Sequence, residues 1–400
     1  MIIELQAWSR KTVSLPAETA TALERSGLVD VRPGATPGEW EIASDSRVGV
    51  CVAEVWELRV HPKLGIPKLL FLLAYARCPD GWRGLAGFGR ERQLLDAVAN
   101  GFAAQCQKAF ERGLLRGYTP IEETRTDLRG RVRFGDQIAR AGGLPLPVEV
   151  SYDNYTEDIP ENRLLLTAAE LLLRLPRIGE RARPQLLAAR AQLDAVRLLR
   201  DRREFKKPPV TRLNKRYEAA MTLAELILNH ASVTARQGQV ASAAFVFDLN
   251  TVFEDFVSTA LKEALQPYGG DVRFQHPDRL DTHHPAALRL KPDITWWSGG
   301  RCLAVIDAKH KSIAHREMPN ADAYQMLAYC TALKQRQGFL VYAKDSGEQQ
   351  RRHVIRNSPY TINVHTLDIE NEPETLLTQV DKLATTIAAT TRLAPNTQAA

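Results

Sequence analysis

Two acidic residues and a lysine in the segment 290–311 have the chemical types of a phosphate-cleaving metal site. The segment reads LKPDITWWSGGRCLAVIDAKHK, with Asp293 after a proline and with Asp307 and Lys309 near the end of an apolar run. Two carboxylates and the strand-end carbonyl of Ala308 would give Mg²⁺ the oxygen ligands it prefers, and Mn²⁺ could substitute. Such an ion lowers the pKa of a bound water and neutralises charge developing at phosphorus. Lys309 could orient or deprotonate the attacking water or stabilise the transition-state charge, and the residue types leave these roles open.

The elements predicted around these residues would bring them together. Apolar residues occupy both parities from 303 to 306, which predicts a strand buried on both faces. Strand period then places Asp307 and Lys309 on one face, and burying such charges costs several kcal/mol per ion, by rough estimate, unless a partner or metal compensates. Pro292 belongs at the start of a strand, and SGGR predicts a tight turn. We therefore expect Asp293 and Asp307 near the same end of a sheet.

Other side chains are weaker candidates for the same site. Glu254 lies on a predicted helix over 249–265 and is a candidate outer metal ligand and catalytic residue. Gln325 and Tyr329, four residues apart on a later helix, share a face and could hold a metal-bound water or contact a phosphate. Local hydrogen bonding is the more usual role of such a pair.

Histidines near the segment suggest a rival zinc or manganese site. None has the HExxH or a comparable helical spacing, so solvated loop positions are the better interpretation, although His310 is next to Lys309. The histidines considered are His276, His283, His284, His310 and His315.

A purely structural interpretation is also available. Asp307 and Lys309 could form an ion pair at a strand end, with Asp293 capping a turn after Pro292. Each short pattern occurs often by chance. Their combination between apolar strands, downstream of an acid-bearing helix, favours the nuclease chemistry.

Composition describes an ordinary chain with hydrophobic cores. The 400 residues are 44% hydrophobic and 25% charged, which predicts two or three domains. The longest apolar run, 66–76, is shorter than the roughly 20 residues of a membrane span, and the first residues lack a signal-peptide pattern. We therefore expect a cytoplasmic protein. Five scattered cysteines predict neither disulfides nor structural zinc, and a net charge of +6 is too mild to decide the function.

The pattern along the chain predicts an α/β protein of several parts. Residues 1–64 are expected to form a small β-rich domain, 65–242 a mainly helical region, 243–370 a compact α/β domain, and 371–400 a polar helix and frayed tail. The α/β domain is expected to run helix, three strands, helix, strand. A basic stretch, 197–216, could lie along a phosphate backbone or be a solvated helix end and loop.

The segments LKPDITWW, AVIDAKHK and NADAYQMLAYC resemble the PD-(D/E)xK nuclease domain of the McrC family, the cleavage subunit of McrBC-type modification-dependent restriction systems. Further segments resemble blocks of this family in the family's order, so the resemblance covers roughly residues 46 to 370. These segments are IPKLLFLLAYA, LRGRVRFGDQI, TEDIPENRLLLTAAELLL, LNKRYEAAMTLAELIL and AFVFDLNTVFEDFV.

The resemblance implies a restriction-endonuclease-like fold and a Mg²⁺-dependent DNA endonuclease. Asp293, Asp307 and Lys309 match the family's catalytic acid, acid and lysine, and Glu254 matches the glutamate of the opening helix. Gln325 and Tyr329 match the later helix. The implied partners are a McrB-like AAA+ GTPase hexamer, docked by the region before the nuclease domain and stimulated by this chain, and DNA containing modified cytosine. The chain itself has no P-loop GxxxxGK[ST].

Some features depart from the family pattern. Residues 1–45 match no recognised block, and the short segment after residue 76 contains Arg77, Arg83, Arg90 and Arg92. That segment could contact the partner or be an ordinary surface loop. A non-catalytic activator of an AAA+ ring and a stand-alone DNA-repair nuclease remain alternatives.

Overall fold

The chain folds into two compact units. The computed structural model describes residues 1–79, 93–141, 146–175, 178–200, 207–234, 242–282, 288–310, 319–343 and 350–392. Unit 1 comprises Met1–Arg92 and Val246–Ala400, and unit 2 comprises Gln93–Phe245. No helix among the described residues is both long enough and apolar enough to cross a membrane.

The N-terminal part of unit 1 is β-rich, as expected for 1–64. Strands β1 (Ile2–Gln6) and β6 (Trp56–His61) pair in parallel, β5 (Arg47–Ala53) pairs antiparallel with β6, and the sheet continues to β11 (Ser242–Asp248). A second sheet has the order β2-β4-β3, formed by Arg10–Ser14, Glu39–Ala43 and Asp30–Pro33, beside helix α1 (Ala17–Arg25).

The C-terminal part of unit 1 is built on a six-stranded mixed sheet of order β12-β15-β16-β17-β19-β18. Strands β16, β17 and β19 are parallel to one another, and the remaining pairs are antiparallel. The predicted helix, three strands, helix and strand are present, but β18 and β19 were not predicted. Bounds are β12 Asp271–Phe274, β15 Ile294–Ser298, β16 Arg301–Lys309, β17 Gln337–Ala343, β18 Gln350–Val354 and β19 Thr361–Leu367.

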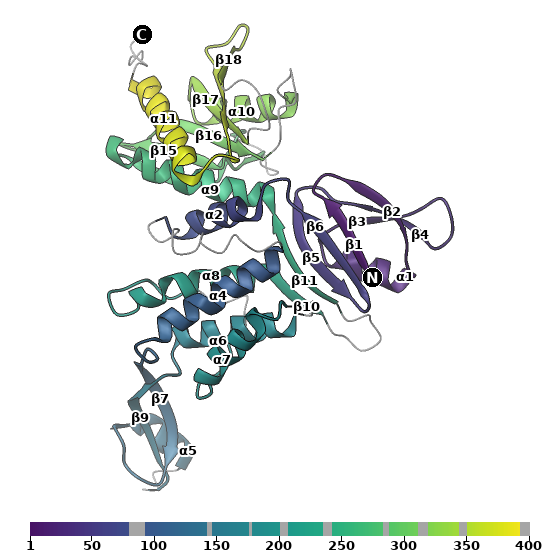
Figure 1. Cartoon of the computed structure of the whole chain (residues 1–400). Coiled ribbons are helices and arrows are strands. Elements are labelled where there is room, and N and C mark those ends of the chain that lie inside the picture. Colours follow the sequence, from purple (N-terminus) through teal and green to yellow (C-terminus); the bar gives the residue numbers. More distant parts are fainter. Residues whose placement is uncertain are drawn as a thin grey trace. The chain divides into compact units, whose positions relative to one another are not determined.

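Helices cover both faces of this sheet (Figure 1). Helix α10 (Asn320–Ala332) packs on β17 and β16, where Met326 and Cys330 join a buried core with Val305. Helices α9 (Leu249–Leu265) and α11 (Pro373–Arg392) pack on each other and on β16.

The predicted domain boundaries at residues 65 and 371 do not coincide with unit 1, which continues to Arg92 and includes the C-terminal helix. Helix α2 (Ile66–Arg77) packs against α9, where Phe71 and Tyr75 make edge contacts with Phe256. The expectation of a polar terminal helix is wrong, because α11 buries an apolar stripe. The stripe consists of Leu376, Val380, Leu383, Ala384, Ile387 and Ala388. Both helices therefore belong to unit 1.

Unit 2 is a helical bundle with a small sheet. Helices α4 (Leu94–Phe110), α6 (Pro160–Arg174), α7 (Ala182–Gln192) and α8 (Glu218–His230) pack together. The sheet has the order β7-β9-β8, formed by Gly117–Arg125, Val148–Thr156 and Arg131–Val132, with helix α5 (Phe134–Ala141) against β9. Strand β10 (Ala231–Thr234) pairs with the first residues of β11.

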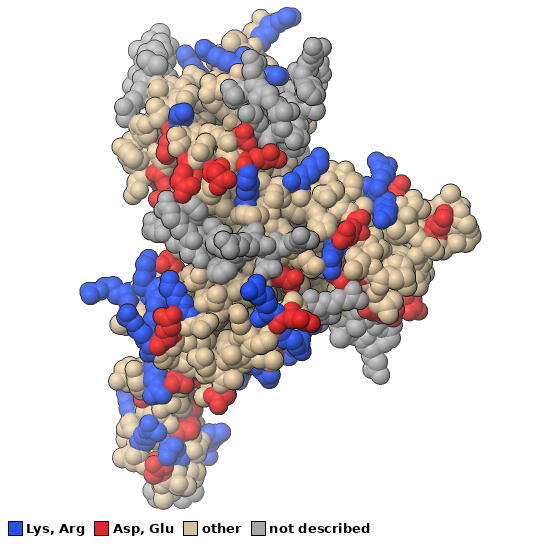
Figure 2. Space-filling model, viewed as in Figure 1, with Lys and Arg blue, Asp and Glu red and all other residues tan. Residues whose placement is uncertain are grey.

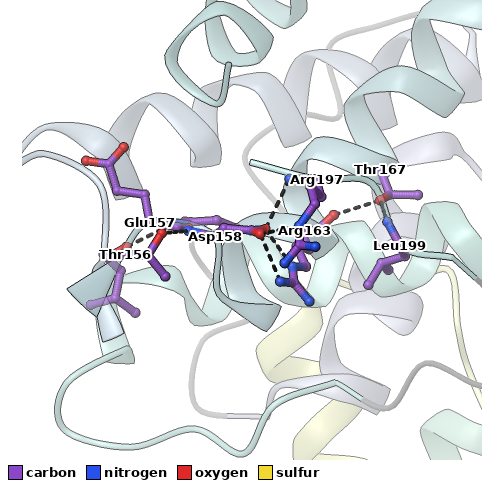
Figure 3. Close-up of polar contacts among 9 residues, drawn as sticks. Thr156, Glu157, Asp158, Arg163, Thr167, Arg197 and Leu199 are labelled. Atoms are coloured by element: carbon purple, nitrogen blue, oxygen red, sulfur yellow. Dashed lines mark hydrogen bonds and ion pairs between the residues drawn. The ribbon is translucent and has the colours of Figure 1, made fainter. Parts of the chain in front are cut away.

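The described part of the basic stretch 197–216 is largely partnered within unit 2. Figure 3 shows Asp158 bound by Arg163 and Arg197; the Arg163 guanidinium donates to both carboxylate oxygens, at 2.6 and 2.9 Å. Arg197 adds its backbone N–H at 3.1 Å and its Nε at 2.5 Å. Lys215 pairs with Glu218 at 2.8 Å. In the view of Figure 2 Lys and Arg residues lie among Asp and Glu residues over unit 2. The contacts of Arg197 and Lys215 favour the solvated interpretation; residues 201–206 lie outside the described residues.

Candidate active site

The antiparallel strand pair β15–β16 brings Asp293 beside Asp307. The strands are joined by a turn in which Gly299 and Gly300 have φ of 57° and 77°, the left-handed conformation that glycine adopts without strain. In the register Ile294 lies opposite Ile306, so the next position places Asp293 opposite Asp307. Both acids are buried, with residual exposures of 9% and 1%.

A side-chain hydrogen bond fixes Asp293 at the end of this strand pair. Asp293 Oδ2 accepts a hydrogen bond from the backbone N–H of Ala308, at 2.9 Å. Asp293 therefore does not simply cap a turn after Pro292, as the structural interpretation held. It links the start of β15 to the end of β16.

Asp307 and Lys309 form the predicted same-face pair. Lys309 Nζ lies 2.6 Å from Asp307 Oδ2, with 23% of the lysine side chain exposed. The contact is an ion pair between a buried carboxylate and a partly exposed lysine. Neither Asp307 oxygen accepts a hydrogen bond from any described residue. A buried carboxylate with one cationic partner is still costly, so these oxygens are suited to an added ligand.

The face that carries Asp307 is the one covered by α10. Val305, two residues earlier, packs in the core with Tyr329 of that helix. Tyr329 is buried, and its hydroxyl donates to the Lys291 carbonyl at 3.2 Å. Burial raises the pKa of Tyr329, and repulsion from ionised Asp307 raises it further. The phenol therefore stays protonated.

Gln325 is placed at the rim of this face. Its side chain is exposed, and its Nε2 donates to the Tyr329 hydroxyl at 2.7 Å. The predicted pair of residues thus forms a continuous chain of hydrogen bonds to the Lys291 carbonyl. This arrangement fits the local hydrogen-bonding role, and contact with a phosphate or a metal-bound water stays a prediction.

Glu254 approaches the same region from α9. Its Oε1 accepts a hydrogen bond from Gln275 Nε2. Burial raises the pKa of Glu254; the Gln275 hydrogen bond opposes this shift, and the neighbouring Asp255 and Asp307 carboxylates add to it. Gln275 was not among the predicted residues. It is held by its backbone N–H, which donates to the Asp293 carbonyl at 2.8 Å.

Burial, together with the neighbouring carboxylates, sets the protonation of the site. Burial raises the pKa of Asp293 to about 8, and repulsion from Asp307 and Glu254 contributes to the shift. Burial lowers the pKa of Lys309, but attraction to Asp307 outweighs it, so the net shift is upward. Lys309 is therefore a cation at neutral pH, and Asp293 holds a proton that a positive charge would displace.

These donors fit a magnesium site of the predicted kind. Asp307 offers two buried oxygens, of which only Oδ2 has a close partner among the described residues, Lys309, and Asp293 beside it would be ionised by a nearby cation. Within the described ranges no three His, Cys, Asp or Glu side chains are grouped as a metal shell. Mg²⁺ commonly binds through one or two carboxylates and keeps several waters. Asp293 and Asp307, with the Ala308 carbonyl, are thus the candidate ligands, and Glu254 fits only the outer position.

The histidines do not form the rival metal site where the structure describes them. His276 makes an edge contact with Trp297, at a centroid distance of 5.2 Å. His310 stacks on Trp8 with ring centroids 5.4 Å apart. His283, His284 and His315 lie outside the described residues, as do Arg83, Arg90 and Arg92 of the segment considered for partner contact.

One further buried contact near the site had no local signal in the sequence. The Tyr342 hydroxyl donates to Asp322 Oδ2 at 2.7 Å, which joins β17 to the first turn of α10. Tyr342 lies beside Lys309 in the parallel β16–β17 register. The contact between Asp322 and Tyr342 depends on the crossover from β16 through α10 to β17, which residue spacing does not reveal.

Comparison with known proteins decides the family. Residues 42–343 match the family described as McrBC 5-methylcytosine restriction system component, and this range is well over half of the chain. The chain belongs to this McrBC family. The matched range includes Asp293, Asp307 and Lys309 and ends within β17. No curated protein matches the chain in sequence.

A chain of one solved McrB–McrC assembly shares the fold. A chain of the Thermococcus gammatolerans half-complex of McrB AAA+ hexamers with bound McrC aligns with a TM-score of 0.61 at 18% identity, covering 97% of this chain and 100% of that one. A chain of the T. gammatolerans McrBC complex aligns with a TM-score of 0.42 at 19% identity, covering 68% and 90%. The first likeness, with the mixed sheet and its helices, confirms the predicted α/β class.

Proposed function

We propose that this chain is the Mg²⁺-dependent endonuclease subunit of a McrBC-type restriction complex and cleaves phosphodiester bonds in DNA that contains modified cytosine. The observation that carries the proposal is the convergence of Asp293, Asp307 and Lys309 at one end of the β15–β16 pair. Among the described residues the buried Asp307 carboxylate has Lys309 as its close partner, at Oδ2, and Oδ1 has no hydrogen-bond partner, so a bound cation would compensate charge that the fold leaves only partly neutralised.

The contacts and protonation states of the site residues indicate a different role for each. Asp293 and Asp307 would hold Mg²⁺, which supplies charge neutralisation and an acidified water when bound. Lys309 remains protonated and reaches solvent, so it is placed to stabilise negative charge on the phosphate oxygens. Because Lys309 is already protonated, it is poorly suited to the role of general base, which the residue types left open. Glu254, held by Gln275, adds negative charge beside Asp307 without completing a ligand shell.

A McrB-like AAA+ GTPase hexamer is the proposed partner. The support is the fold likeness along almost the whole chain to a structure described as McrB AAA+ hexamers with bound McrC. We propose that this chain stimulates the partner's GTP hydrolysis and that cleavage is gated by it. A role in assembly alone would not explain why Asp293, Asp307 and Lys309 converge.

The test is cleavage of modified DNA by the complex with Asp307→Ala. We expect Mg²⁺-dependent cutting to be abolished while partner binding and GTPase stimulation persist, because Asp307 is buried in unit 1 and carries the oxygens meant for the cation. Asp381→Ala, an exposed acid on α11 of the same unit, is the matched control and should cut normally. Cleavage by Asp307→Ala at the wild-type rate would refute the proposal.

A further inference from the structure

Trp8, at the turn between β1 and β2, is exposed and has a positive φ. Trp8 keeps 44% of its surface accessible and has φ of 59°, a conformation uncommon for large side chains. The turn is held on both sides: Trp8 N–H donates to the Asp45 carbonyl at 3.0 Å, and the Ser9 hydroxyl donates to the Gln6 carbonyl at 2.6 Å. Strained residues held in this way gather at functional sites.

The Trp8 ring contacts His310, the residue that follows Lys309, on the side of the sheet where α9 packs. It stacks on the His310 ring, at 5.4 Å between centroids and 20° between planes. His310 follows Lys309 in the chain, and the edge of Phe253, the residue before Glu254, contacts the same imidazole at 5.7 Å. The β1–β2 turn, the end of β16 and helix α9 therefore meet at His310, all within unit 1.

A positive charge accompanies the exposed indole. Lys63 Nζ lies 5.9 Å from the Trp8 ring centroid, and the lysine is exposed. An exposed aromatic ring with a neighbouring cation is the combination with which proteins hold single nucleic-acid strands: the ring stacks on a base and the cation attracts the backbone phosphate.

We propose that Trp8 and Lys63 form a strand-holding platform for the DNA next to the scissile phosphate. Trp8 would stack on a base of the cut strand that has left the duplex stack, and Lys63 would pair with a phosphate near it. Both are positioning residues, and the idea rests on the proposed nuclease function. Trp8 lies outside the residues 42–343 that match the family, so the match does not assign it this role.

Packing alone accounts poorly for Trp8. A side chain that served only to join the β1–β2 turn to His310 would gain most when fully buried, and this one leaves almost half of its surface to solvent. A partner protein covering the ring is the competing explanation, and the experiment separates the two.

The test compares Trp8→Ala, Trp8→Phe and Lys63→Ala in the full chain with its AAA+ partner. We expect Trp8→Ala to raise KM for modified DNA by about 5- to 100-fold, the range for loss of one stacked base, with a smaller change in kcat. Trp8→Phe should restore most of the affinity, because a phenyl ring also stacks. Lys63→Ala should lower the salt dependence of binding by about one phosphate contact. Lys11 is an exposed lysine on β2, and Lys11→Ala is the control that should change neither KM nor the salt dependence of binding.

Intrinsic fluorescence supplies a readout that a structural role would not move. Duplex DNA added to the full chain should quench wild-type emission more than that of Trp8→Phe, the difference being Trp8. An unchanged KM in Trp8→Ala and Lys63→Ala, while Asp307→Ala abolishes cutting, would overturn the platform and leave the nuclease standing. Quenching of Trp8 by the partner without DNA would assign the ring to a protein interface instead. Cutting by Asp307→Ala would refute the nuclease proposal, whether Trp8 contacts DNA or a partner protein.

Discussion

Asp293 Oδ2 accepts a hydrogen bond from the Ala308 N–H at 2.9 Å, which joins two sequence motifs 15 residues apart. The bond sets Asp293 beside Asp307 at the end of β16, where the β15–β16 ladder stops. Because one oxygen of Asp293 is committed to the backbone, its carboxyl plane is fixed before any ligand arrives. Such preorganisation of a first ligand is what a metal-assisted hydrolase requires.

Lys309 is predicted to act as a cation. Attraction to Asp307 outweighs burial and keeps the pKa of Lys309 above its usual value, so the side chain stays charged through the neutral range. Lys309→Ala should lower single-turnover cleavage by about 10²–10³-fold, the usual effect of losing one charge-stabilising donor. Lys309→Arg should retain a larger fraction, because it keeps the charge.

The pH dependence of these variants is the discriminating measurement for Lys309. If Lys309 were a general base, Lys309→Arg would be as inactive as Lys309→Ala, and wild-type activity would rise as the lysine deprotonates. A charge-stabilising Lys309 gives no such rise.

The Asp158 cluster is predicted to stabilise unit 2 in a pH-dependent way. Hydrogen bonds from Arg163, and then from Arg197, lower the pKa of Asp158 below the ordinary value of 3.8. A lowered folded-state pKa contributes stability above the unfolded-state pKa, and this is lost as pH falls through the folded-state value. Asp158→Asn should therefore lower the free energy of unfolding by about 1–3 kcal/mol at pH 7 and by less at pH 3.

Urea unfolding of the full chain at both pH values measures the Asp158 effect. Asp153→Asn, an exposed acid on β9 of the same unit, is the control and should leave stability nearly unchanged. An equal loss at pH 3 and pH 7 would show that Asp158 acts through packing rather than charge.

The sequence predicted the part of the site that is encoded locally. Pro292, the glycine turn and the apolar run before Asp307 are neighbours in the chain, so their strand pairing and the meeting of Asp293 with Asp307 could be predicted. The polar sequence of β18, QRRHV, lacks an apolar pattern because this strand lies at the sheet edge. The apolar stripe of α11 is interrupted by threonines, which made the helix look polar.

Contacts between distant segments could not be predicted in the same way. Gln275 beside Glu254, Asp322 beside Tyr342, and Trp8 on His310 each join elements whose proximity depends on the packed fold. No periodicity in the sequence encodes such a pair. For the same reason the sequence pattern alone places α2 in the middle region, although Phe71 packs on Phe256 of unit 1.

Divalent-cation binding to the full chain tests the central claim most directly. Calorimetric titration with Mn²⁺ should show one site in the wild type, lost in Asp307→Asn and weakened in Asp293→Asn. Because the pKa of Asp293 is raised to about 8, binding should release a proton and tighten as pH rises from 6 to 8, and Asp293→Asn should remove this dependence. Unchanged Mn²⁺ binding in Asp307→Asn would contradict the assignment of Asp293 and Asp307 as the ligands of a catalytic cation.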